Sequence, residues 1–132
     1  IANNGVEKDI GIIDSIVNKD GDLIKKYNRE EDKRILPENI CQIVQEYLVD
    51  VVDNGTAREI NLDEIGGAGG KTGSAQAVLN EQMTIHGWFA GFFPREEPEY
   101  IITVFVEEGK SGAGTAAPIF EKISKEIYKI NR

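Results

Sequence analysis

Apolar residues cluster along the chain at two different spacings, and these spacings predict the secondary structure. From Ile10 to Tyr27, two apolar groups flank Asn18-Lys19-Asp20-Gly21-Asp22, and because Asp-Gly is a strong turn signal this pattern predicts a β-hairpin. Charged residues dominate from Asn28 to Arg34, which predicts a loop. After Pro37, apolar residues recur every three or four positions as far as Asn54-Gly55, a helix-ending pair, and predict one long helix. The apolar stripe of this helix consists of Ile40, Ile43, Val44, Tyr47, Leu48 and Val51.

The second half of the chain changes to strand-like patterns. The aromatic run from Thr84 to Phe93 predicts a strand that Pro94 closes, and the run from Tyr100 to Val106 is apolar on both faces, which predicts a buried strand. A Gly/Ser loop from Gly109 to Gly114 then leads into a last helix that begins near Pro118. The stripe of that helix consists of Ile119, Phe120, Ile123, Ile127 and Ile130. The order of elements predicts an α+β fold in which helices flank an antiparallel sheet.

The composition of the chain argues against several classes of function. The 132 residues suit one domain or a piece of one, and the net charge of −8 argues against nucleic acid as a partner, because phosphate binding needs clustered Lys and Arg. Cys41 is the one cysteine, so a disulfide and a Cys-based zinc site within the chain are excluded, and we expect it in the core. His86 is the one histidine. We expect no metal, no cofactor and a soluble chain without a membrane-spanning run.

The glycine-rich stretch Gly66 to Ala75 raises the question of a phosphate site. A Walker loop needs a glycine five residues before the Gly-Lys-Thr end, but that position is Ile65, and a polar run precedes the stretch where a buried strand is required. A second pattern, Gly112 to Ala117, matches the loose dinucleotide form G-x-G-x-x-A, yet no further strand follows it. We therefore interpret the second pattern as a loop that caps the last helix.

The same stretch also fits an edge strand. On a strand from Gly70 to Ala75, Lys71 and Gly73 face one way, while Thr72 and Ser74 face the other. Glycine leaves one face open, and free backbone groups can pair with an extended peptide whose terminal carboxylate the lysine and hydroxyls hold. The alternative is a lysine in a glycine-rich turn without a ligand.

Five segments of the chain, in order, resemble the penicillin-binding proteins. Lys71-Thr72-Gly73 resembles the K-T-G motif that these enzymes share with serine β-lactamases. Asn54-Gly55-Thr56-Ala57 looks like their G-T-A segment, and the stretch from His86 to Pro94 looks like their W-F-x-G-x-x-P strand. Gly112 to Phe120 resembles the loop and helix start at the end of the transpeptidase domain, and Ile1 to Gly5 resembles an A-N-x-G helix end. The pattern looks most like a monofunctional, class B enzyme of the elongation or division type.

This resemblance implies acyl transfer on peptidoglycan stem peptides that end in D-Ala-D-Ala, with β-lactams as substrate mimics. In the family, a serine attacks the penultimate D-Ala carbonyl. Carried over, Lys71 supplies positive charge near the substrate carboxylate and belongs to the general-base network, while Thr72 and Ser74 hydrogen-bond that carboxylate. The backbone N–H of Ser74 is one of two oxyanion-hole donors, and Gly73 keeps the strand face open. Trp88 and His86 are interpreted as packing residues of the neighbouring strand.

The nucleophile of the family has no counterpart in the chain. None of the serines, Ser15, Ser74, Ser111 and Ser124, begins an S-x-x-K or an S-x-N motif. We therefore expect residues 1–132 to be the C-terminal portion of a transpeptidase domain that is inactive alone and needs its N-terminal part. An open edge on the strand Ile101–Val106 would favour self-association. The resemblance also implies a parent anchored in the bacterial cytoplasmic membrane, with this domain on the outer face.

Two other interpretations stay open at this point. A β-lactam-recognising receptor or a serine β-lactamase shares K-T-G, although the Gly55-Thr56-Ala57 and Ala116 to Phe120 segments favour a transpeptidase. A non-catalytic module could also capture a peptide carboxylate on the Lys71 strand without chemistry, and the absent nucleophile suits that function.

Overall fold

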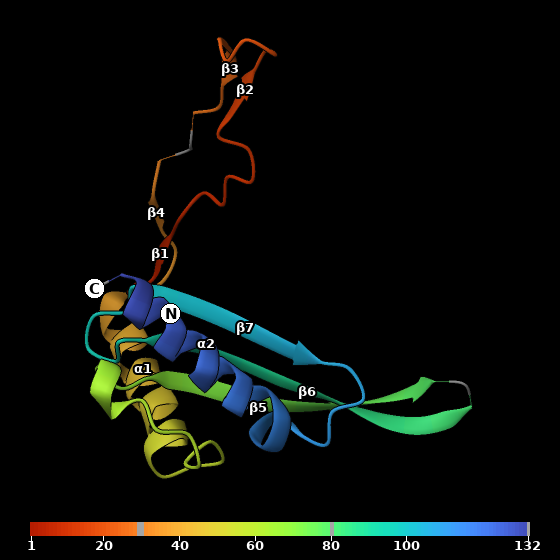
Figure 1. The fold of residues 1–132 in the computed structure, drawn as a ribbon. Coiled ribbons are helices and arrows are strands. Elements are labelled where there is room, and N and C mark those ends of the chain that lie inside the picture. The colour runs from red at the N-terminus through yellow and green to blue at the C-terminus, as the bar shows by residue number, and fades with distance from the viewer. Residues whose placement is uncertain (29–30, 80, 132) are drawn as a thin grey trace.

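A three-stranded antiparallel sheet forms the centre of the computed structural model, which describes residues 1–28, 31–79 and 81–131 (Figure 1). Its strands are β5 (Gly69–Leu79), β6 (Gln82–Phe93) and β7 (Tyr100–Val106), in the order β5-β6-β7. The glycine-rich stretch thus continues as an edge strand and not as a loop that enters a helix, so the structure agrees with the exclusion of a Walker loop. The predicted α+β fold is confirmed.

Two long helices accompany the sheet. α1 (Glu38–Asp53) follows Pro37 directly and contacts β5, and α2 (Ala117–Ile130) lies across β6 and β7 (Figure 1). At the end of α1 the N–H of Gly55 donates to the carbonyl of Asp50 over 2.9 Å, as expected for the Asn-Gly ending. Short helical turns precede β5 and α2, namely η1 (Asp63–Ile65) and η2 (Gly112–Ala116). The glycine pattern at 112–117 therefore lies at the start of the last helix, as the sequence predicts, but it forms a helical turn and not a loop.

The core lies between the sheet and α2. Phe120 of α2 is fully buried, and its ring centroid lies 4.8 Å from that of Phe89 and 6.3 Å from that of Phe93, both on β6. Buried side chains of the segment between α1 and β5 complete the cluster, among them Ile60 and Leu62. The stripe predicted for α2 is only partly buried: Phe120 and Ile127 belong to this packing, whereas Ile119, Ile123 and Ile130 are 39%, 39% and 79% exposed. Ala117, Phe120 and Ser124 are the buried residues of the helix.

The prediction that β7 is buried on both faces is wrong. Val104 is 7% exposed and faces the core, whereas Ile101 and Phe105 are 68% and 47% exposed. Side chains alternate between the faces of a strand, and α2 covers one face of this sheet. The other face carries the apolar side chains of β7 without a covering layer in the described part of the chain.

The apolar stripe predicted for α1 is only partly buried. Ile40, Ile43 and Tyr47 are exposed, while Cys41 and Val52 are the buried residues of the helix. The helix therefore turns a second apolar face outward. The expectation that Cys41 lies in the core as a free thiol is confirmed.

An arm extends from the body before α1 (Figure 1). β1 (Val6–Glu7) pairs with β4 (Lys33–Arg34) at its base, and β2 (Ser15–Val17) pairs with β3 (Leu23–Lys26) further out. The hairpin predicted from the Asp-Gly signal is thus confirmed, with Gly21 in the left-handed region at φ 89°. Residues 1–5 form turns where the sequence predicts a helix end, and 29–30 of the predicted charged loop lie outside the described residues.

Replacing Phe120 by Ala tests the core. We expect Phe120→Ala to lower the free energy of unfolding by about 3–5 kcal/mol, because it leaves a cavity between Phe89 and Phe93. The matched control is Ile130→Ala on the same helix, where the side chain is 79% exposed and we expect a change within about 0.5 kcal/mol. Urea unfolding of the chain measures both, and equal losses would show that this cluster is not the core.

Candidate functional site

The candidate site is built on the edge strand β5. Lys71 pairs with Ala90 and Gly73 pairs with Trp88, whereas Thr72 pairs with Phe89. Residues that pair directly across antiparallel strands share a face, so Thr72 lies on the core face with Phe89. Lys71 and Gly73 accordingly lie on the open face, as the sequence analysis predicts.

The open face around Lys71 is accessible to solvent. Lys71 is exposed, and its ammonium donates to the carbonyl of Thr72 over 2.7 Å. A Cβ on Gly73 would lie 3.2 Å from the Cβ of Trp88, so the glycine keeps this face free of a second side chain beside the tryptophan. The indole packs on Phe105 with ring centroids 4.4 Å apart. The packing role predicted for Trp88 is consistent with this contact, and the result is a cation beside an open strip of backbone.

On the core face, two hydroxyls of β5 have partners from distant segments. The Oγ1 atoms of Thr72 and Thr56 are 2.8 Å apart, and the backbone N–H of Gly112 donates to Oγ of Ser74 over 3.3 Å. A hydroxyl has one proton and two acceptor lone pairs. The pair of threonines uses one proton between them, and Ser74 acts as an acceptor, so two O–H groups keep a proton for a ligand.

Gly112 lies directly against the backbone of β5. A Cβ at this residue would fall 2.5 Å from the carbonyl oxygen and 2.7 Å from the nitrogen of Gly73, and it would also collide with the carbonyl oxygen of Trp88. Only a residue without a side chain permits this approach. The start of η2 thereby supports the stretch of β5 between Thr72 and Ser74.

Sequence reasoning brought Lys71, Thr72, Gly73 and Ser74 together correctly as one strand segment, and their roles stay predictions. It gave no site role to Thr56 or Gly112. Both residues belong to segments that resemble the family, and this resemblance was the feature of the sequence that could have indicated a role in the site.

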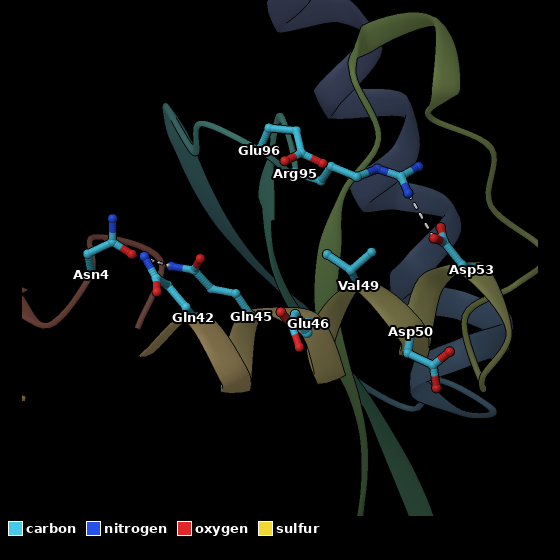
Figure 2. A pocket seen from close by; sticks show the side chains of 9 residues that line it. All are labelled: Asn4, Gln42, Gln45, Glu46, Val49, Asp50, Asp53, Arg95 and Glu96. Carbon is cyan, nitrogen blue, oxygen red and sulfur yellow. Dashed lines mark hydrogen bonds and ion pairs between the residues drawn. The ribbon is translucent and has the colours of Figure 1, made fainter. Parts of the chain in front are cut away.

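A separate hollow lies between α1 and the turn after β6 (Figure 2). Figure 2 shows Arg95 directed at Asp53, 2.8 Å away, and the same guanidinium lies 3.3 Å from Asp63. A Cβ on Gly67 would overlap this guanidinium, so the glycine gives Arg95 its place. The hollow shares no residue with the candidate site, and its arginine joins the β6–β7 turn to the end of α1. The residues that line it are Asn4, Gln42, Gln45, Glu46, Val49, Asp50, Asp53, Arg95 and Glu96.

Within 1–28, 31–79 and 81–131, no three His, Cys, Asp or Glu side chains are grouped so as to hold a metal ion. Over the same ranges, no helix has both the length and the apolar character that crossing a membrane requires.

The chain belongs to the penicillin-binding protein transpeptidase family, because the family model described as the penicillin binding protein transpeptidase domain matches residues 1–125. The peptidoglycan D,D-transpeptidase FtsI homolog of Chlorokybus atmophyticus is 30% identical over 114 residues, 80% of this chain and 17% of that protein. The peptidoglycan D,D-transpeptidase MrdA of Acinetobacter baumannii is 37% identical over 95 residues, 59% of this chain and 14% of that protein.

The fold of this chain is similar to that of a solved transpeptidase domain. The D,D-transpeptidase domain of a peptidoglycan glycosyltransferase from Eggerthella lenta has a TM-score of 0.75 and 26% identity. The likeness covers 97% of this chain and 30% of that chain. The chain thus spans less than a third of each of these proteins. The predicted membership of the class B penicillin-binding proteins is confirmed.

Introducing a methyl group at Gly112 tests the support of β5. We expect Gly112→Ala to lower the free energy of unfolding by about 1–3 kcal/mol, because η2 must move off Gly73. The amide resonances of Gly73 and Ser74 should shift at the same time. Gly114→Ala is the control, because its Cβ would meet only Oγ of Ser111, at 3.0 Å. Equal effects of the two variants in denaturation and in NMR spectra would contradict the support role.

Proposed function

We propose that this chain forms the substrate-binding wall of a peptidoglycan D,D-transpeptidase, an enzyme that cross-links stem peptides ending in D-Ala-D-Ala and that binds penicillin. The observation that carries the proposal is the free edge of β5, with Lys71 on its open face and the hydroxyls of Thr72 and Ser74 on its core face. Membership of the penicillin-binding protein transpeptidase family supports it.

The edge position explains how groups on opposite faces act on one ligand. A peptide that adds to β5 as a further strand lies in the plane of the sheet, beside the edge, and so within reach of both faces. Lys71 then offers positive charge to the terminal carboxylate, and the free O–H groups of the Thr56–Thr72 pair and of Ser74 donate hydrogen bonds to it. Charge-assisted bonds of this kind are about twice as strong as neutral ones.

The backbone N–H of Ser74 is proposed as one of two donors to the oxyanion. A serine oxygen attacks the penultimate D-Ala carbonyl, and the developing negative charge on the carbonyl oxygen is stabilised by these donors. The bond to the terminal D-Ala breaks, this residue leaves with a proton on its nitrogen, and an acyl ester remains. An amine of a neighbouring stem peptide then attacks the ester, forms the cross-link and returns the proton to the serine oxygen. β-Lactams enter the first step and remain as the ester.

The attacking serine is proposed to come from a part of the transpeptidase outside residues 1–132. No serine of the chain begins an S-x-x-K motif, and the chain spans 13% to 30% of the curated relatives. We therefore propose that residues 1–132 are the C-terminal portion of the domain, inactive alone, in a parent that is anchored in the cytoplasmic membrane. A peptide-carboxylate-binding module without chemistry is the second candidate, favoured by the absent motif.

Labelling with a fluorescent penicillin tests the proposal. We expect no covalent label on this chain alone and a stoichiometric label when it is combined with the upstream part of its transpeptidase, because the serine and the wall are then together. Lys71→Gln should lower the acylation rate of the combined protein by about 10²- to 10⁴-fold, the range typical of acid–base groups. Lys110→Gln, an exposed lysine outside β5, is the control. Association of the pieces without labelling would favour the non-catalytic module.

The outer edge of β7 is proposed to pair with strands of the missing part. β7 ends the sheet, and its open face exposes Ile101 and Phe105. An unpaired apolar edge favours pairing with another chain. We expect the isolated chain to self-associate as its concentration rises, as measured by light scattering. Phe105→Lys should reduce this association, and a monomer at all concentrations would argue against an open edge.

A further inference from the structure

The imidazole of His86 holds a turn that leads back to the candidate site. The backbone N–H of Glu108 donates to Nδ1 of His86 over 3.1 Å, and the ring packs edge-on against Phe105 with centroids 5.3 Å apart. A backbone amide is always a donor, so Nδ1 must be unprotonated and the neutral ring must carry its proton on Nε2. The packing role predicted for His86 is therefore accompanied by a specific hydrogen bond.

The residue that donates this hydrogen bond, Glu108, has an unfavourable backbone conformation. Its φ of 53° lies in the left-handed region, which residues with side chains rarely occupy. The next residue, Gly109, is buried, and its N–H donates to the carbonyl of Val106 over 3.3 Å. A Cβ on Gly109 would lie 3.2 Å from the nitrogen of Gly87, so the turn rests on β6 beside His86.

The turn continues directly into η2, which touches β5. Ser111 caps the start of η2, and its Oγ accepts a hydrogen bond from the N–H of Gly114 over 2.9 Å. The following residue, Gly112, donates to Oγ of Ser74 and lies against the backbone of Gly73. The segment from Glu108 to Gly112 is thus fixed at one end by His86 and meets the candidate site at the other.

We propose that His86 is a positioning residue for acylation: its Nδ1 fixes Glu108, and through residues 108–112 it sets the place of Ser74. The proposal rests on the proposed function, in which the backbone N–H of Ser74 stabilises the oxyanion. A misplaced donor of this kind weakens stabilisation of the transition state more than binding of the ground state. Loss of the His86 contact therefore lowers the acylation rate constant and leaves the affinity of the first complex nearly unchanged.

Two substitutions separate the hydrogen bond from the packing. His86→Phe keeps a ring against Phe105 and removes the acceptor, whereas His86→Asn removes the ring and keeps an acceptor near the position of Nδ1. Stopped-flow acylation of the complete transpeptidase domain by fluorescent penicillin gives the rate constant and the dissociation constant separately. We expect His86→Phe to lower the rate constant about tenfold with the dissociation constant within about twofold, and His86→Asn to stay within about threefold of wild type.

If His86→Phe were acylated at the wild-type rate and His86→Asn more slowly, the ring packing and not the hydrogen bond would set the rate. This result would overturn the proposal. Equal rates in all three proteins would overturn it as well. A wild-type domain that penicillin does not acylate would instead refute the proposed function. A second measurement tests the hydrogen bond between Glu108 and His86 without any activity. It also applies if His86→Phe fails to fold, because it uses the wild-type protein. Long-range ¹H–¹⁵N spectra of the wild-type protein should identify Nδ1 as the acceptor nitrogen of His86, and a tautomer with its proton on Nδ1 would refute the hydrogen bond.

Discussion

The close approach of Gly112 to the backbone of Gly73 is the constraint on which this half of the molecule depends. It brings the start of η2 against the edge strand, and it leaves no room for a side chain. Because η2 runs directly into α2, the same contact aligns the buried rings of the core with the strand that carries Lys71. The start of the last helix therefore connects the core to the stretch of β5 around Gly73.

Alternation along three paired strands lets the sheet serve two purposes. Phe89 and Val104 point into the core, while their neighbours Trp88 and Phe105 stand on the open face next to Gly73. The core residues stabilise the sheet by removing apolar surface from water. The open face carries a lysine and exposed backbone around Gly73, whereas Phe92, further along the same face of β6, is buried.

Local patterns in the sequence predicted most elements correctly. The spacing after Pro37 predicted α1, the Asp-Gly turn predicted the hairpin, and the K-T-G strand was correctly identified as an edge. The error at β7 arose because apolar composition shows what a strand can bury, whereas the layer that buries it lies elsewhere in the fold. The partners of the site hydroxyls could not be predicted, because Thr56 and Thr72 are 16 residues apart and Ser74 and Gly112 are 38 apart. Periodicity carries no information about such distant contacts.

The order of the strands has a consequence for how the chain assembles. β5, β6 and β7 are neighbours in sequence and in space, and α2 packs on the two strands before it. Closing a short loop costs less chain entropy than closing a long one, and folds rich in local contacts form faster. The arm and α1, by contrast, join through distant contacts such as that between Gln45 and Ile1. The sheet that carries Lys71 thus pairs its strands through contacts that are local in sequence and entropically cheap, whereas the contacts of Thr56 and Gly112 with β5 span a longer stretch of chain.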